Sequence, residues 1–162
     1  MKILISPAKS LDFENNIETS YSSSPLFADK ALEINNTLKE LSAPDLGNLM
    51  SISPKLSDLN WLRNQDFQKN NSKQRQAIFA FNGDVYEGID ATSISSSNHD
   101  KLQNTLRILS GLYGILKPFD NIKPYRLEMG TKISIKLTKI LKFPSESVIV
   151  ASLEVIFNTC TP

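Results

Sequence analysis

The chain has 162 residues, 40% of them hydrophobic and 22% charged, which is enough for one globular domain and too few for two of ordinary size. Its formal net charge of +1 gives no sign of a polyanion partner, and no apolar stretch has the length of a membrane span. With one cysteine and one histidine, the chain excludes an internal disulfide and a His/Cys metal cluster. We therefore expect a cytoplasmic protein with no metal site and no cofactor.

The N-terminal part of the chain predicts a strand followed by a long helix. Residues Lys2–Ser6 form a short β-branched run that ends at Pro7, which is typical of a buried strand. Ser24 followed by Pro25 has the pattern of an N-cap and a first helical residue, and apolar residues at helical spacing follow. This helix is expected to end before Pro44.

Two short helices follow, Pro44–Met50 and Pro54–Phe67, with a break at Ser51–Ser53. Such a pair resembles a helix-hairpin-helix, a unit that directs backbone amides at a phosphate. Lys55 lies at the start of the second helix, where it would add a positive charge. The usual hairpin glycines are absent, so the residues alone favour an ordinary helical corner.

The middle of the chain predicts a second strand, Ala77–Phe81, and a turn at Asn82–Gly83. A short helix at Asn98–Thr105 then leads into a strand at Leu106–Leu109. Together these elements predict a mixed α/β domain of the α+β kind, with a small mixed sheet flanked by helices.

The segment Leu106–Lys132 carries the strongest signs of a functional site. Its glycines and prolines indicate tight, rigid turns, which would hold polar side chains in place. Arg126 would suit a phosphate or a carboxylate, Glu128 would orient it, and tyrosines would offer stacking surfaces for bases. The alternative is a buried Arg–Glu pair with packed tyrosines, and the residues do not decide between the two.

Basic residues are concentrated in the same third of the chain. Residues 101–142 hold nine Lys and Arg against Asp120 and Glu128, whereas residues 1–100 carry an excess of acids. This third either follows the phosphates of a nucleic acid or is a solvated lysine-rich surface, and charge alone favours the surface. Lys9, just past the first strand, would meet a phosphate or a carboxylate, or would be solvated or paired with Asp12.

No pattern in the chain identifies a catalytic residue. Ser6 and Lys9 match the S-x-x-K spacing of penicillin-binding proteins, but a match is expected by chance and this serine follows a strand. Ser110 lacks the preceding glycine of a nucleophile elbow and has no histidine near it in sequence. We assign no catalytic residue.

Three motifs occur in the order that they have in a known family: SPAKSLDF at Ser6–Phe13, AIFAFNGDVYEGI at Ala77–Ile89, and the segment Leu106–Lys132. They resemble the YaaA family of bacterial peroxide-stress proteins, and the resemblance covers roughly residues 1–139. It implies resistance to hydrogen peroxide by limiting free iron, together with DNA binding through a helix-hairpin-helix and a positively charged cleft. It supplies no catalytic residues.

The sequence therefore predicts a protein that binds double-stranded DNA and limits free iron and oxidative damage, and that is not an enzyme. The alternative is an enzyme or ligand-binding protein that takes a phosphorylated or carboxylated metabolite between Lys9, Arg126 and Glu128. The predicted DNA- or anion-binding residues are Lys9, Lys55, Lys117, Tyr125 and Arg126, with Tyr113 and Glu128 in support.

Residues 140–162 do not resemble the family, whose members continue well past this point. We divide the chain into a family-like part, residues 1–139, and a tail, residues 140–162. Our hypothesis is a frameshift near codon 139 that leaves the fold incomplete and the function impaired. The alternative is a genuine short variant. The tail contains an almost uncharged run, Val148–Phe157, of the kind that aggregates when nothing covers it.

Overall fold

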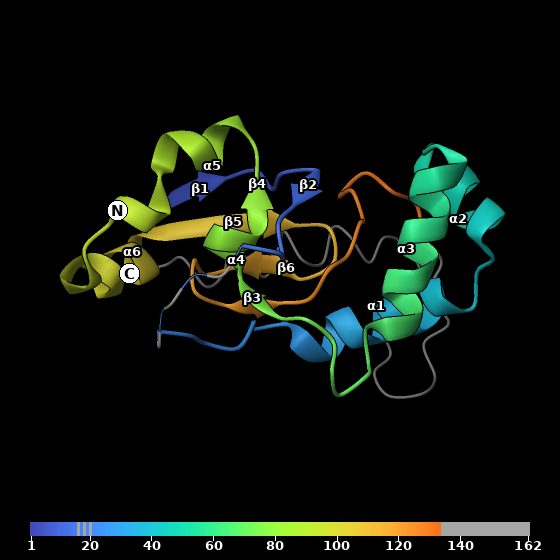
Figure 1. Ribbon diagram of the computed structural model, residues 1–162, viewed down its shortest axis with the longest axis horizontal. Helices are drawn as coiled ribbons and strands as arrows, with labels where there is room; N and C mark the ends of the chain where they lie inside the picture. The colour runs from blue at the N-terminus through green and yellow to red at the C-terminus, as the bar shows by residue number, and fades with distance from the viewer. Residues whose placement is uncertain (16, 18, 20, 134–162) are drawn as a thin grey trace, which may run out of the picture.

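Six α-helices, two short 3-10 helices and seven short strands make up residues 1–15, 17, 19 and 21–133, the part of the chain that this computed structural model describes (Figure 1). This confirms the predicted α+β class. None of these helices is long and apolar enough to cross a membrane. Both predictions for the C-terminal tail, its separate origin and its aggregation-prone run, fall outside the described residues.

A three-stranded sheet lies at the centre of the fold. Strand β5 (Leu106–Ser110) is its middle strand, parallel to β1 (Ile3–Ile5) and antiparallel to β6 (Gly114–Leu116). Alternate β5 residues are buried, as expected for a strand with one face on the core. The sheet order brings Ile108 between Ile5 and Leu116.

Two strand pairs extend this centre. Strand β2 (Ser10–Leu11) is antiparallel to β4 (Phe81–Asn82), and β3 (Arg75–Gln76) is antiparallel to β7 (Asn121–Ile122). Each pair joins residues that are distant along the chain. The ordered loops around the sheet therefore depend on long-range pairing.

Strand β1 is present where it was predicted, but it is not buried. The side chains of Ile3 and Leu4 are 42% and 50% exposed. Strand β1 is at an edge of the three-stranded sheet and pairs only with β5 among the described residues. A short β-branched run predicts a strand but does not reveal which face of it is covered.

The first helix, α1 (Ala28–Lys39), begins later than predicted, and Ser24 does not cap it. The backbone of Ser23 is held instead by the distant β7 region, since its N–H donates to the Phe119 carbonyl and its carbonyl accepts from Asn121, both at 2.8 Å. Pro25 then occupies a turn, which the N–H of Ala28 closes on the Pro25 carbonyl at 3.3 Å. Pairing with a remote segment has overridden a local capping signal.

The predicted strand at residues 77–81 is wrong. Residues Ala77–Ala80 form a single buried helical turn, α4, and only Phe81–Asn82 is extended. The N–H of Ala77 donates to the Asp120 carbonyl at 2.9 Å, and that of Ile78 to the Pro118 carbonyl at 2.8 Å. Because these amides are satisfied by a neighbouring loop, the apolar run is buried without extending.

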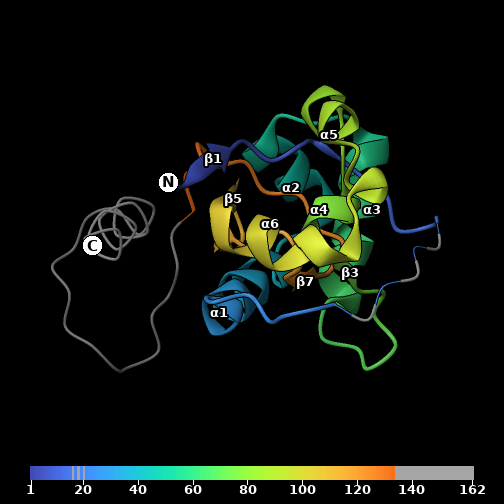
Figure 2. The same ribbon diagram turned by 90° about the vertical axis from the view of Figure 1, so that its left-hand side faces the viewer.

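The remaining helices frame the sheet. After β4 comes α5 (Asp84–Ile89), followed by two 3-10 helices, Ala91–Ser93 and Ser96–Asn98. Helix α6 (His99–Thr105) then leads directly into β5, as predicted. Helices α5 and α6 lie at the opposite end of the molecule from α2 and α3 (Figure 1). Figure 2 views the molecule from the end that carries α5 and α6.

Helices α2 (Ala43–Met50) and α3 (Pro54–Asp66) confirm the two short helices predicted from the prolines. Each has a serine as its N-cap, Ser42 and Ser53. Their side-chain oxygens accept hydrogen bonds from the backbone N–H groups of Asp45 and Leu56, respectively.

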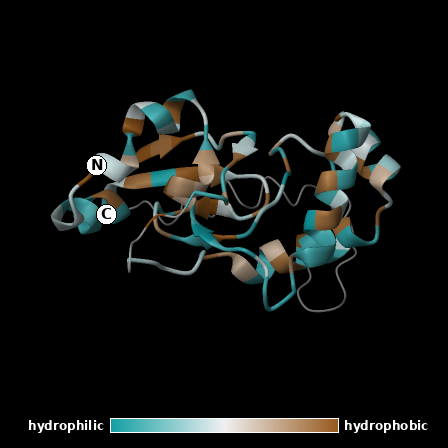
Figure 3. Ribbon diagram, viewed as in Figure 1, coloured by the Kyte–Doolittle hydropathy of each residue, from teal (hydrophilic) through white to brown (hydrophobic). Residues whose placement is uncertain are grey.

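Strand β1 is drawn in brown as a run of hydrophobic residues, whereas hydrophobic and polar residues alternate along β5 and along α3 (Figure 3). The buried side chains of α3 are nevertheless polar: Ser57, Asn60 and Asn64. Leu59 and Leu62 are 42% and 52% exposed.

Candidate functional site

The candidate site lies at the carboxyl ends of β1 and β5. Because these strands are parallel, the residues that follow them emerge at the same edge of the sheet, the place where open α/β sheets bind ligands. Ser6 and Lys9 follow β1, while Ser110 ends β5 and Gly111 comes next. The segment after β7 crosses the same edge.

Hydroxyl groups converge beneath this edge. Ser110 Oγ lies 2.6 Å from the Tyr125 hydroxyl and accepts from the Tyr113 N–H at 2.9 Å. The hydroxyl of Tyr86, on α5, donates to the Ser6 carbonyl at 2.8 Å. Burial raises the pKa of both Tyr86 and Tyr125, so these phenols stay protonated and neutral. They fix the strand ends rather than carry charge.

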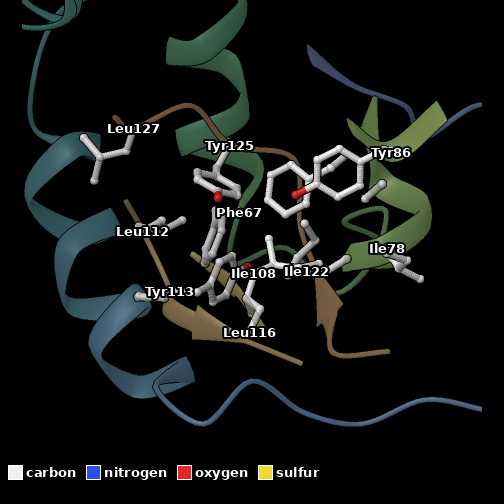
Figure 4. Packing of buried hydrophobic residues seen from close by; sticks show 14 of the residues in the cluster. Phe67, Ile78, Tyr86, Ile108, Leu112, Tyr113, Leu116, Ile122, Tyr125 and Leu127 are labelled. Carbon is white, nitrogen blue, oxygen red and sulfur yellow. The ribbon is translucent and has the colours of Figure 1, made fainter. Parts of the chain in front are cut away.

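The tyrosines predicted to stack on bases are part of the core. Tyr125 is only 6% exposed, and its ring meets that of Tyr113 edge to face at 5.5 Å (Figure 4). Tyr113 packs against Phe67 at the end of α3, its hydroxyl accepts from the Lys123 N–H at 3.1 Å, and burial raises its pKa to about 12. Both tyrosines are packed, as in the alternative interpretation, and neither ring offers a stacking face. The Arg–Glu pair of that alternative is not buried, because the side chain of Glu128 is 46% exposed.

Gly111 sets the path of the segment that carries the charged residues. A Cβ on Gly111 would overlap the backbone carbonyl of Leu127. The two backbones therefore touch at a point that only glycine permits. This contact places Arg126 and Glu128, on either side of Leu127, beside the end of β5.

Lys9, Arg126 and Glu128 come together, as the sequence predicted for the ligand-binding alternative. Both cations approach the same oxygen, Glu128 Oε1, from 3.3 Å for Lys9 Nζ and 3.5 Å for Arg126 Nη2. Both distances exceed those of a strong charged hydrogen bond. The side chain of Arg126 is only 17% exposed, whereas that of Lys9 is 74% exposed. One weakly held carboxylate thus serves two cations.

Lys9 does not pair with Asp12, because Asp12 holds a different cation. Nη1 of the buried Arg75 lies 3.2 Å from Asp12 Oδ2. Hydrogen bonds from the backbone of Glu14 and from the side chain of Asn15 lower the pKa of Asp12 to about 2, and Arg75 adds to this. Asp12 thereby fixes the loop after β2.

Arg63, on α3, is the residue of the site that sequence reasoning missed. Desolvation by burial, followed by the positive charge of Arg126, lowers the pKa of Arg63. Arg63 Nη1 donates to the neutral Asn60 Oδ1 at 3.3 Å. The sequence around Arg63 is an ordinary polar helix, and only the fold brings it to the segment after β7.

The other predicted binding residues lie elsewhere. Lys117 is exposed and follows β6, at the opposite end of the β5–β6 hairpin from Gly111. Its backbone N–H donates to Asp120 Oδ2 at 2.8 Å. Lys55 is exposed in the first turn of α3. It precedes Arg63 by eight residues, about 12 Å along a helix. The predicted residues are thus at three separate places. Within the described ranges, no group of three His, Cys, Asp or Glu residues could hold a metal ion.

Fold and site together define an α+β protein with a cationic cluster at a parallel strand end. The chain belongs to the family of the peroxide stress protein YaaA, whose model matches residues 1–152. This confirms the resemblance found in the three motifs.

Several curated relatives, all UPF0246 proteins, are similar to the chain. One from Flavobacterium johnsoniae is 50% identical over 143 residues, covering 87% of this chain and 57% of the relative. One from Burkholderia pseudomallei is 48% identical over 136 residues, covering 83% and 52%. One from Flavobacterium psychrophilum is 48% identical over 143 residues, covering 87% and 57%. The chain spans about half the length of the curated relatives that it matches.

Proposed function

We propose that the protein acts in peroxide-stress protection, that it binds double-stranded DNA and helps to limit free iron and oxidative damage, and that this function is impaired in the present chain. Family membership supports the stress role. The observation that supports DNA binding is the geometry of the hairpin formed by α2 and α3.

Three residues connect the two helices in a tight reversal. Ser51, after α2, has a left-handed backbone with φ of 52°, and the Ile52 N–H returns to the Gly47 carbonyl at 3.0 Å. A Cβ on Gly47 would lie 2.5 Å from Ser57 Oγ, so the helices are in close contact near the turn. This arrangement supports the helix-hairpin-helix interpretation over an ordinary helical corner.

The hairpin directs the N-terminus of α3 outward. The positive end of the helix dipole favours a phosphate group, and Lys55 adds a full charge in the same turn. Pro54 has no N–H and the Leu56 N–H is capped by Ser53, so the attraction rests mainly on the dipole and on Lys55. An open groove of about 490 Å³ lies between the helices; its lining residues are Ala43, Pro44, Gly47, Asn48, Ser51, Ile52, Pro54, Ser57 and Asp58.

Asp58 in this groove and Asp45 in the first turn of α2 oppose the charge of Lys55. The hairpin therefore contacts few phosphates, and binding is expected to be weak and without base specificity.

The test is the affinity of the full chain for a short DNA duplex, measured by fluorescence anisotropy. Lys55→Ala is expected to weaken binding about equally for unrelated duplex sequences, because phosphate contacts carry no sequence information. Lys39→Ala, which removes the same charge from the exposed end of α1, is the matched control. Equal affinities for wild type and Lys55→Ala would contradict the proposal.

A second candidate function is the binding of a small phosphorylated or carboxylated metabolite between Lys9, Arg126 and Glu128. The specific observation in its favour is the long approach of both cations to one carboxylate oxygen. A stronger anion would displace such a contact at little cost.

A further inference from the structure

Helix α3 carries its leucines on the side that faces away from the protein. Its buried side chains are polar: Ser57, Asn60 and Asn64. Leu59 and Leu62 are 42% and 52% exposed, although α1 and α2 both pack on this helix. Helices α2 and α3 lie together at one end of the molecule, away from the central sheet (Figure 1). Within the described ranges, the apolar side of α3 is therefore left uncovered.

These leucines belong to a longer row of side chains, which we call the α3 stripe: Lys55, Leu59, Leu62 and Asp66. Successive members are four, three and four residues apart, which is the spacing of the contact positions in a coiled coil. At about 3.6 residues per turn, such residues lie in one line along a helix, and here that line is opposite the buried side. All four members are exposed.

The charges of the α3 stripe are self-complementary. Lys55 lies at its N-terminal end and Asp66 at its C-terminal end, with the leucines between them. If two copies of the stripe meet antiparallel about a two-fold axis, Lys55 of each copy faces Asp66 of the other, and Leu59 of each faces Leu62 of the other. A parallel pairing would place like charges opposite each other. The sequence of α3 thus favours one orientation.

Both charged ends of the stripe are able to form such pairs. In the part of the chain that the structure describes, no carboxylate lies within 4.0 Å of Lys55 Nζ. Asp66 Oδ1 lies 2.5 Å from Lys69 Nζ, but these two side chains are 53% and 60% exposed. An exposed ion pair between neighbouring turns of a helix contributes little to stability, so Asp66 can change partner at little cost.

We propose that the α3 stripe is the contact surface of a homodimer, in which a second copy of this chain packs its own α3 antiparallel against it. The interface is isologous, since each contact occurs twice. Helix α3 has 13 residues and is about 20 Å long, which is short for an interface of standard size, so the dimer is weak and reversible. The dimer occupies Lys55 and thereby competes with a DNA phosphate, but it does not depend on DNA binding.

Sedimentation velocity of the full chain without DNA, over a range of protein concentrations, tests the proposal. We expect a monomer–dimer equilibrium. Lys55→Glu and Asp66→Lys are each expected to raise the dissociation constant about tenfold, because two attractive contacts per dimer become repulsive. Each change also suits the helix dipole at its own end of α3, so the helix is expected to remain folded.

The same two changes supply a rescue. When the Lys55→Glu and Asp66→Lys variants are mixed, every charged contact between them is again one of opposite sign, so a heterodimer is expected. The double variant is expected to dimerise about as well as wild type for the same reason. Leu59→Gln and Leu62→Gln are expected to abolish the dimer. Val85→Gln, which removes a 53% exposed apolar side chain from α5, is expected to leave it unchanged.

A protein that is monomeric at every concentration overturns the proposal. It would leave the α3 stripe to another occupant, such as the part of the longer relatives that this chain does not span. Self-association that Lys55→Glu and Leu59→Gln leave unchanged overturns the proposal too, because the contact then lies elsewhere. Failure of both the mixture and the double variant to restore a lost dimer also contradicts the antiparallel pairing. None of these outcomes decides whether the monomer binds DNA.

Discussion

Gly111 lies directly against the backbone carbonyl of Leu127, with no room for a side-chain carbon between the two chains. This contact joins the end of β5 to the segment that carries Arg126 and Glu128. It explains in physical terms why a glycine stands between a strand and a turn in the motif Leu106–Lys132.

Gly111→Ala is expected to lower the free energy of unfolding by about 1–3 kcal/mol, the usual cost of overpacking a rigid site. Gly88→Ala is the control, because a Cβ on Gly88 meets nothing within 4 Å and alanine favours a helix. Urea unfolding measures both. Equal stability of the two variants would show that the backbones do not touch.

Ser110 is expected to contribute more to stability than the hydroxyl of its partner Tyr125. Tyr125→Phe removes one buried hydrogen bond, whereas Ser110→Ala also leaves the Tyr113 N–H without its acceptor. We expect losses of about 1 kcal/mol and about 2–3 kcal/mol, respectively, in urea unfolding. Ser93→Ala, which removes an exposed hydrogen bond from the serine hydroxyl to the Asp90 carbonyl, is expected to change the free energy of unfolding little. The reverse order for Ser110 and Tyr125 would contradict this arrangement.

The contact between Gly47 and Ser57 predicts a rescue. Gly47→Ala is expected to destabilise the α2–α3 hairpin, because the new methyl would lie 2.5 Å from Ser57 Oγ. Adding Ser57→Ala removes that oxygen and is expected to restore most of the loss, so the two changes are not additive. A double-mutant cycle in urea measures this coupling. Strict additivity would mean that the helices are not in contact there.

Asp12 is expected to make stability fall in acid. Its folded pKa of about 2 is below the ordinary value of 3.8, so its stabilising effect is complete above pH 3.8 and is lost as the pH falls through 2. The excess stability of wild type over Asp12→Asn is therefore expected to shrink between pH 4 and pH 2. Urea unfolding at a series of pH values measures it. A difference that is constant over this window would contradict the role of Asp12.

Elements with strong local signals could be predicted from the sequence. Prolines and N-cap serines define α2 and α3 without help from the rest of the chain. The five apolar residues at 77–81 do not define their element in this way, because a short buried run has no periodicity that distinguishes a strand from a helical turn. The predicted start of α1 was wrong for another reason, since the backbone of Ser23 is hydrogen-bonded to residues almost one hundred positions away.

The site shows the same division. The sequence predicted that Lys9, Arg126 and Glu128 belong together. In the structure Lys9 and Arg126 both approach one carboxylate oxygen of Glu128. It did not identify Arg63, since nothing in a polar helix indicates which residue will meet a distant loop. It also left open whether Tyr125 packs or stacks, because an aromatic side chain in a loop is compatible with both.

The salt dependence of duplex binding tests the proposed function most directly. For wild type, the logarithm of the association constant is expected to fall linearly with the logarithm of salt concentration, by about 0.9 for each phosphate contacted. Lys55→Ala is expected to reduce that slope by about 1. A wild-type affinity that does not change with salt, or a slope that Lys55→Ala leaves unchanged, would contradict DNA binding through the α2–α3 hairpin.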